Sequence, residues 1–532
     1  MKRRYLLQLG LVGRAVGLNE PASLASASRK SFDVAEASLA QLQSAMAAGR
    51  LTALALVDIY IARIQSIDKT GPRLNAIIEL NPDARAIATV LDQERSAKGP
   101  RGPLHGIAVL LKDNIATGDR MLTTAGSLAL AGTPATKDAF LVSQLRKAGA
   151  VILGKTNLSE WANIRSTRST SGWSTRGGLT RNPYALDRNT SGSSAGSAAA
   201  IAACLAAIAV GTETDGSITS PASMASLVGI KPTLGLVSRA GIVPIAHSQD
   251  TAGPMARTVG DAAALLSAMA GTDPQDAATA PANQRKTDFL KALDTNALKG
   301  KRIGVVRSQF AAQSDQVAAL TVAALGVLVA QGAILVDVTE IPNTANYAET
   351  ELTVLLTELK VNLPLYLAAY APDAPVKTLA DVIAFNARHA GRELKYFGQE
   401  LLIKAEATSG LTSKAYTDAL ANNRKYAGKL GIDAALAAGR LDALVAPTGG
   451  LAWLTDFVNG DNSGASFSSP AAVAGYPHIT VPCGFVQGLP CGLSFVGPAW
   501  SDAALIGMAY AYEQASKRRR APTYPKSVNP KV

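Results

Sequence analysis

A short, uninterrupted apolar run at residues 107–111, Ile-Ala-Val-Leu-Leu, is the feature that most restricts how this chain can fold. A run of this length with no polar alternation is typical of a strand that is buried on both faces of a sheet. The pattern that follows predicts a helix over 142–148, which ends at Gly149, and a second strand over 150–153. This alternation predicts an α/β fold with a mostly buried sheet.

The same reading extends along the rest of the chain. Residues 348–430 are expected to be mainly helical, and the long Ser/Thr/Gly/Asn-rich stretch 163–197 is expected to be a functional loop. Further strands are predicted at 227–230, 301–306, 334–338, 441–446 and 478–482, and further helices at 35–48, 52–66, 198–209, 317–331 and 503–514. The longest apolar run, 198–210, is interpreted as a core helix, because about 18 residues are needed to span a membrane. Since no repeat or linker divides the chain, we expect one large domain.

The formal net charge of +12 is concentrated at the two ends of the 532-residue chain. Residues 1–33 carry +4 and residues 517–532 carry +6, which leaves +2 for the rest. A nucleic-acid-binding groove needs basic residues gathered on one face of the folded body. The distribution therefore argues against a nucleic-acid partner. We expect a basic leader or arm at 1–33, one enzyme domain at 34–515 and a basic tail at 516–532.

The N-terminus supports two interpretations. Lys2-Arg3-Arg4 precedes an apolar stretch and then small residues, which is the order of a secretory signal, and the paired arginines also fit twin-arginine export. Arg14 interrupts the apolar stretch, which favours a basic arm instead. An exported, periplasmic protein and a cytoplasmic one therefore both remain open. Cys204, Cys483 and Cys491 form no pair with zinc-site spacing, and we expect neither a metal nor a cofactor.

Three polar segments lie directly beside predicted buried structure. Lys112 ends the apolar run, so desolvation should lower its pKa and make a neutral amine available as a base. Taken alone, this position is explained as simply by a structural lysine whose ammonium reaches solvent. The segment 191–197, Ser-Gly-Ser-Ser-Ala-Gly-Ser, can present backbone N–H groups and hydroxyls, or simply cap a helix. The segment 211–218, Gly-Thr-Glu-Thr-Asp-Gly-Ser-Ile, can form an oxyanion-binding turn or an ordinary polar turn.

Residues 192–196 also match the G-x-S-x-G nucleophile elbow, which would make Ser194 the nucleophile. An elbow follows a buried strand, whereas residues 184–190 are polar. The chain has only four histidines, and none has a distinctive local signature for a catalytic partner. This alternative is therefore disfavoured.

Taken together, the three segments resemble the amidase signature family in order and spacing. The resemblance covers nearly all of 34–515, and within the family the chain is most similar to the bacterial peptide amidases, which remove the C-terminal amide of peptides. The segments that carry it include Leu104-His105-Gly106, Lys112-Asp113-Asn114, Gly192-Ser193-Ser194-Ala195-Gly196, Gly211 to Ile218, Val228-Gly229-Ile230-Lys231-Pro232-Thr233 and Ser159-Glu160-Trp161-Ala162-Asn163. The resemblance implies a single large α/β domain with a mixed sheet wrapped by helices.

The resemblance also implies roles for individual residues. Ser217 would be the nucleophile, Ser193, with a cis peptide bond, would relay its proton, and Lys112 would accept and return that proton. The oxyanion hole would consist of the backbone N–H groups of Thr214, Asp215, Gly216 and Ser217. The reaction would be hydrolysis of carboxamide bonds through an acyl-enzyme, releasing ammonia.

The chain departs from the family pattern at several positions, and these departures bear on the substrate. Many members have Gly in place of Ala195, Asp-x-Gly-Gly-Ser in place of residues 213–217, and Arg in place of Thr219. Without a cation at Thr219, a malonamide or glutamine substrate is less expected. Peptide C-terminal amides are the leading substrate class. The alternatives are a broad-specificity aliphatic or aryl amidase, an A-type component of an amidotransferase that works on charged tRNA, and a non-catalytic binding protein.

Overall fold

Eleven strands form one mixed sheet in the computed structural model, which describes residues 32–528. In spatial order they are β1 (Ile77–Leu80), β3 (Val151–Thr156), β2 (Ala108–Lys112), β6 (Ile208–Glu213), β8 (Thr251–Ala256), β7 (Val228–Lys231), β12 (His478–Val486), β13 (Leu489–Val496), β11 (Ala443–Pro447), β9 (Arg302–Val306) and β10 (Ile334–Val338). Every residue of β2, β3, β6 and β8 is buried, as the uninterrupted apolar runs predict.

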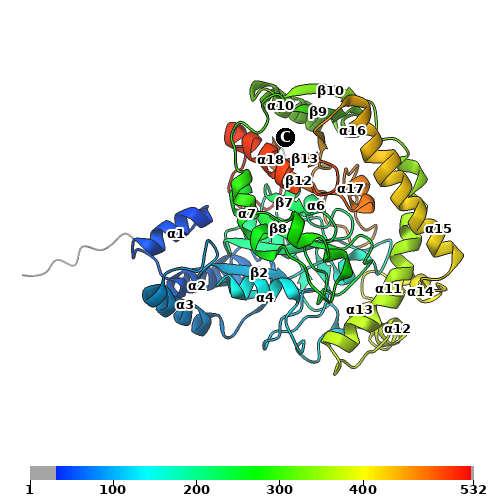
Figure 1. Cartoon of the computed structure of the whole chain (residues 1–532). Helices are drawn as coiled ribbons and strands as arrows, with labels where there is room; N and C mark the ends of the chain where they lie inside the picture. Colours follow the sequence, from blue (N-terminus) through cyan, green and yellow to red (C-terminus); the bar gives the residue numbers. More distant parts are fainter. Residues whose placement is uncertain (1–31, 529–532) are drawn as a thin grey trace, which may run out of the picture.

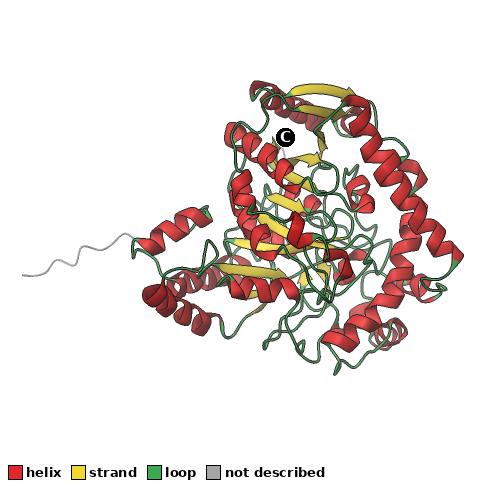
Figure 2. Cartoon of the chain, in the orientation of Figure 1, coloured by secondary structure: helices red, strands yellow, loops and turns green. Residues whose placement is uncertain are grey.

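Helices surround the sheet, so the predicted α/β fold with a mixed, helix-wrapped sheet is confirmed (Figure 1 and Figure 2). Helices α7 and α18 pack on the central strands, and α11 to α15 form a separate arc on the side of the molecule away from α1 to α3 (Figure 1). The α-helices are α1 (Leu39–Ala47), α2 (Ala53–Arg63), α3 (Ala84–Lys98), α4 (Phe140–Lys147), α5 (Ala195–Ala202), α6 (Thr219–Met224), α7 (Val259–Met269), α8 (Ala282–Arg285), α9 (Arg307–Ala311), α10 (Asp315–Ala330), α11 (Ala348–Tyr370), α12 (Leu379–Arg388), α13 (Ala390–Glu393), α14 (Glu400–Glu406), α15 (Lys414–Asn423), α16 (Asp433–Gly439), α17 (Ser469–Ala474) and α18 (Asp502–Ser516).

Three neighbouring strands position the site. β2 runs parallel to both β3 and β6, so all three carboxyl ends lie at one edge of the sheet. Lys112 is the last residue of β2, and the 214–217 turn follows the last residue of β6. The carboxyl ends of neighbouring parallel strands are where α/β folds place their reactive groups.

The single helix predicted over 198–209 is wrong. Helix α5 ends at Ala202, Cys204 adopts a left-handed backbone with φ of 54°, and Ile208 begins strand β6. The run is almost all small apolar residues, which fit a buried helix and a buried strand equally well, so the sequence pattern contained no boundary. The 211–218 segment therefore follows a strand and not a helix. The long loop 163–197 contains one small hairpin, β4 (Trp173–Ser174) and β5 (Gly178–Leu179).

Residues 344–370, which include α11, are long and apolar enough to cross a membrane by length and composition. Half of the most apolar window is buried inside the molecule, where Leu359, Leu363 and Leu367 belong to the main hydrophobic core. Helix α11 is thus a structural element of the folded body in this structure.

The predicted leader or arm at 1–33 lies almost entirely outside the described residues. The first part of the predicted basic tail packs against the body: Arg519 donates to the Glu36 carboxylate and to the carbonyls of Ser226 and Ala202. Its charge therefore contributes to local packing near the start of the described chain.

Candidate active site

Lys112 is fully buried at the end of β2, as the apolar run before it predicts. Its Nζ donates to the Ser193 hydroxyl at 2.7 Å, to the Thr212 hydroxyl at 2.8 Å and to the Thr212 carbonyl at 3.1 Å. Burial lowers the pKa of Lys112 to about 7, although Asp250 and Glu213 act in the opposite direction. The ammonium does not reach solvent, and a neutral amine is accessible near neutral pH.

Ser193 lies in the loop that leads into α5, and its peptide bond with Gly192 is cis. Its side chain is fully buried, its carbonyl accepts from the Ser159 N–H at 3.1 Å, and the Ser194 N–H donates to the Ser217 carbonyl at 3.1 Å. A Cβ on Gly192 would lie 2.2 Å from the Ser159 Oγ, so only glycine fits beside this serine. The loop thus holds Ser193 between Lys112 and the 214–217 turn.

Ser217 ends that turn and is 8% exposed, so it is the member of the predicted trio that lies at the surface of the site. Gly216 has φ of 76°, a conformation that favours glycine. Among the described contacts, the Ser217 hydroxyl makes no hydrogen bond to Ser193 or Lys112. The structure therefore joins Lys112 to Ser193 through side chains, and Ser217 to this pair through the backbone.

A buried carboxylate holds the far side of the same turn. Glu213 Oε2 accepts from the N–H groups of Ile218 at 2.7 Å and Thr219 at 2.9 Å, and from the Thr219 hydroxyl at 3.2 Å. Lys231 is also fully buried nearby, and its positive charge opposes the rise in the pKa of Glu213 that burial causes. Glu213 and Thr219 are thus hydrogen-bonded to each other. Both are positions where the sequence departs from the family pattern.

Asp250 is a residue of the site that the sequence analysis missed. Its carboxylate accepts from the Thr214 hydroxyl and from the N–H groups of Ile245 and Ala246. Burial raises the pKa of Asp250 to about 6. Asp250 directly precedes β8, and the pairing of β8 with β6 brings its carboxylate to the 214–217 turn.

The alternative nucleophile Ser194 has a structural role. Its hydroxyl is fully buried, donates to the Thr212 carbonyl at 3.1 Å and accepts from the Thr212 N–H at 3.2 Å. His105 is buried and bonded to the Leu91 carbonyl, and His478 is bonded to Ser494. Neither arrangement couples a histidine to Ser194, which agrees with the rejection of the elbow motif.

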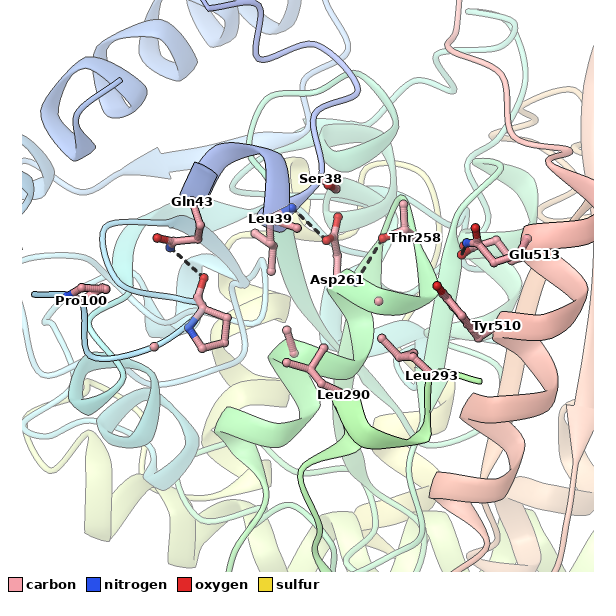
Figure 3. Close-up of a pocket in the computed structure, with 16 residues that line it drawn as sticks. Ser38, Leu39, Gln43, Pro100, Thr258, Asp261, Leu290, Leu293, Tyr510 and Glu513 are labelled. Atoms are coloured by element: carbon pink, nitrogen blue, oxygen red, sulfur yellow. Dashed lines mark hydrogen bonds between the residues drawn. The ribbon is translucent and has the colours of Figure 1, made fainter. Parts of the chain in front are cut away.

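A separate cavity of about 600 Å³ lies where α1, α7 and α18 meet (Figure 3). Its polar groups hold helix ends: Asp261 accepts from the Leu39 N–H, Thr258 caps α7, and Glu513 accepts from the Val259 N–H. No member of the predicted trio lines it. Within residues 32–528, no group of three or more His, Cys, Asp or Glu side chains has a metal-binding arrangement.

Comparisons with known proteins agree with this geometry. The amidase family model matches residues 55–506. A probable amidase of Arabidopsis thaliana is 42% identical over 503 residues, covering 93% of this chain and 92% of the plant protein. The crystal structure of the peptide amidase of Stenotrophomonas maltophilia is 53% identical with a TM-score of 0.87, covering 92% of this chain and 99% of that one. The A-type component of the glutamyl-tRNA(Gln) amidotransferase of Chloroflexus aurantiacus is 36% identical, covering 89% of this chain and 96% of that protein.

The fold, the buried lysine–serine contact and these similarities define a hydrolase that acts on amide C–N bonds. The chain belongs to the amidase signature family.

Proposed function

We propose that this enzyme hydrolyses the C-terminal amides of peptides with Ser217 as nucleophile, Ser193 as relay and Lys112 as base. The observation that carries the proposal is the 2.7 Å contact between the buried Lys112 Nζ and the Ser193 hydroxyl. Burial makes neutral Lys112 available near pH 7, and within residues 32–528 the hydroxyls to which it donates are those of Ser193 and Thr212. Of these two residues, Ser193 belongs to the loop that is hydrogen-bonded to Ser217 through the Ser194 N–H.

In the acylation step, Ser217 Oγ attacks the carboxamide carbon while its proton passes to Ser193, and the Ser193 proton passes to Lys112 Nζ. The N–H groups of Thr214, Asp215, Gly216 and Ser217 would receive the developing oxyanion, and losing one such donor typically costs roughly 3 kcal/mol of barrier. The protonated Lys112 returns a proton through Ser193 as the C–N bond breaks, which releases ammonia. Water then attacks the acyl-enzyme by the same route and frees Ser217.

In this scheme the Ser193 and Ser217 hydroxyls approach each other when substrate fills the site. Catalytic hydrogen bonds are often long in free enzymes and shorten in the complex. The bonds from Glu213 and Asp250 to the turn leave Ser217 Oγ as its movable part, because the backbone on either side is held. Rotation of the Ser217 side chain about its first torsion is the movement that the proposed relay requires.

An aromatic cluster beside the site supports a peptide substrate. Ser171 lies against Gly192, since a Cβ there would be 3.3 Å from the Ser171 Cβ. Two residues further on, Trp173 packs edge-on against Tyr396 at 5.3 Å, and Tyr396 stacks on Phe457 at 4.1 Å between ring centroids. Tyr396 is 37% exposed, so this apolar wall is accessible to side chains of a bound peptide.

The test is ammonia release from a panel of peptide amides and small aliphatic and aryl amides, without ATP or tRNA. We expect turnover of the peptide amides by the native chain and at least about a thousandfold loss in Ser217→Ala. Ser194→Ala, which changes the neighbouring buried serine, is the matched control for damage to the loop. Full activity in Ser217→Ala would reject the proposed nucleophile, and turnover limited to small amides would favour the broad-specificity alternative.

A further inference from the structure

A pair of carboxyl groups lies on the oxyanion turn and takes no part in the mechanism above. Asp215 belongs to the turn, and Glu351 lies in the first turn of α11. The two carboxyl groups are close enough to interact, and the charge of Asp215 raises the pKa of Glu351. Their contact joins the arc of helices α11 to α15 to the loop that carries Ser217.

The other contacts of the pair show where a proton must be. Asp215 Oδ2 accepts from the Ser469 hydroxyl at 2.6 Å, whereas the buried Asp215 Oδ1 has no donor. Glu351 Oε1 accepts from Gln249 Nε2 at 2.9 Å, which leaves Oε2 to carry a proton. A protonated Glu351 can donate to Asp215 Oδ1, which otherwise lacks a partner, and this avoids the repulsion between two ionised carboxylates in contact.

Gln249 extends the contact to the backbone of the turn. Its Nε2 also approaches the Thr214 carbonyl at 3.4 Å, so a single amide group lies between Glu351 and the residue that begins the predicted oxyanion hole. A change in the charge of the carboxyl pair therefore reaches two of the four predicted oxyanion donors, at Thr214 and Asp215.

We propose that one proton shared by Asp215 and Glu351 clamps the oxyanion turn to helix α11, and that the enzyme loses activity at alkaline pH when this proton leaves. The inference rests on the proposed function of the turn. Glu351 is a positioning residue in this scheme, because it acts on the oxyanion donors through Asp215 and Gln249. Once both carboxyls are ionised, their repulsion moves the turn away from α11 and misaligns the N–H groups.

The surrounding charges agree with this assignment. Burial, followed by the charge of Asp215, raises the pKa of Glu351 to about 8. Burial raises the pKa of Asp215 as well, opposed by the hydrogen bond from Ser469 and by the charge of Lys231. The buried hydroxyl of Tyr347, the residue before α11, also faces the pair, and its pKa is raised, so it stays neutral.

Other groups around the turn titrate elsewhere or act on both carboxyls alike. Asp250, on the opposite side of Thr214, has a pKa of about 6 and is ionised before Glu351. Lys231, with a pKa lowered by burial to about 8, loses its charge over the same range as Glu351 and would strengthen the repulsion. Further along α11, Glu358 accepts from the Ser248 N–H and from Tyr416, away from the pair.

The experiment compares Glu351→Gln with Glu349→Gln, an exposed glutamate on the same helix turn. The glutamine side chain always carries an N–H donor, so we expect the activity of Glu351→Gln to lie within about fivefold of wild type at pH 7. The alkaline limb of its kcat/KM profile should be absent or moved up by at least one pH unit. Wild type and Glu349→Gln should share a limb near pH 8. Glu351→Ala should lower kcat by about ten- to a hundredfold with a smaller change in KM, because it removes positioning and not substrate contact.

A second measurement does not depend on turnover. Infrared difference spectra in heavy water should show a protonated carboxyl band at pH 7 that is present in Glu349→Gln and lost in Glu351→Gln. Identical pH profiles and identical carboxyl bands for the two glutamine variants would overturn the shared proton. Those results would not affect the assignment of Ser217 as nucleophile, which Ser217→Ala tests separately.

Discussion

Two buried lysines on neighbouring parallel strands show what separates a base from a structural cation. Lys112 ends β2, and Lys155 lies in β3 beside Leu111, so the two side chains point to opposite faces of the sheet. Both are fully buried. Burial lowers the pKa of Lys112 to about 7 and that of Lys155 to about 8.

The difference lies in what each ammonium touches. Lys155 Nζ donates to the Ile115 carbonyl at 2.6 Å and to the Thr123 hydroxyl at 2.8 Å, and the carboxylates of Asp113, Asp119 and Glu79 oppose the lowering of its pKa by burial. Lys112 instead contacts Ser193, whose loop leads to Ser217. Burial alone therefore does not define a catalytic lysine. A catalytic lysine must also contact a hydroxyl that can pass a proton to a nucleophile.

The largest expected effect separates the two lysines by activity. We expect Lys112→Met to lower kcat/KM for peptide amides by at least about a thousandfold, since no base remains to take the Ser193 proton. Lys155→Met, assayed at a temperature where it is folded, should keep activity within about tenfold of wild type. Steady-state ammonia release measures both, and equal losses in the two variants would erase the distinction.

The free energy of unfolding should rank the two variants in the opposite order to their activity. Lys155→Met leaves the Ile115 carbonyl without its donor and removes one of the two cations, the other being Arg176, that compensate buried Asp113, at an expected cost on the order of 2 kcal/mol. Lys112→Met removes a desolvated amine with no carboxylate in contact, so its free energy of unfolding should match or exceed that of wild type at pH 6. Urea unfolding at pH 6 compares them. A Lys112→Met protein that is the less stable of the two would contradict the assignment.

The pH dependence of wild type provides the third comparison. Because neutral Lys112 is the active form, kcat/KM should rise about tenfold per pH unit below about pH 7 and then stop rising, until the alkaline limb near pH 8 that the Asp215–Glu351 proton predicts. Lys155 titrates near pH 8, and its variant should preserve this acid limb. A rate that is flat from pH 5 to pH 7 would exclude Lys112 as the base.

The two lysines also show which features of the site could be predicted from the sequence and which could not. The apolar run before Lys112 predicted its burial, and the resemblance to the amidase signature family implied that Ser193 and Ser217 would lie near it. Lys155 ends a similar run in the segment Leu153-Gly154-Lys155-Thr156-Asn157, so local pattern cannot tell the two apart. Their roles depend on which groups the sheet register and the loops bring to each side chain, and that information is non-local.

The same limit explains the other differences from the sequence analysis. The helix predicted over 198–209 failed because alanine-rich sequence fits helix and buried strand alike, and the break at Cys204 depends on its backbone conformation. Asp250 and Glu351 were missed because they reach the turn from β8 and α11, respectively. The Glu213–Thr219 contact was visible only as two separate departures from a family pattern, although each side chain explains the other.

The smallest expected effect tests the hydroxyl environment that distinguishes the two lysines. Thr212 Oγ1 accepts from Lys112 Nζ and so stabilises its charged form, while also accepting from Asn114. Thr212→Val should therefore lower the apparent pKa of the acid limb by less than about one unit, because a single acceptor is lost and Ser193 and the Thr212 carbonyl remain. Thr123→Val, which removes the matching hydroxyl from Lys155, should leave that limb in place. Profiles of kcat/KM between pH 5 and pH 8 are the measurement, and a limb that moves upward in Thr212→Val, or moves equally in both variants, would show that it does not report on Lys112.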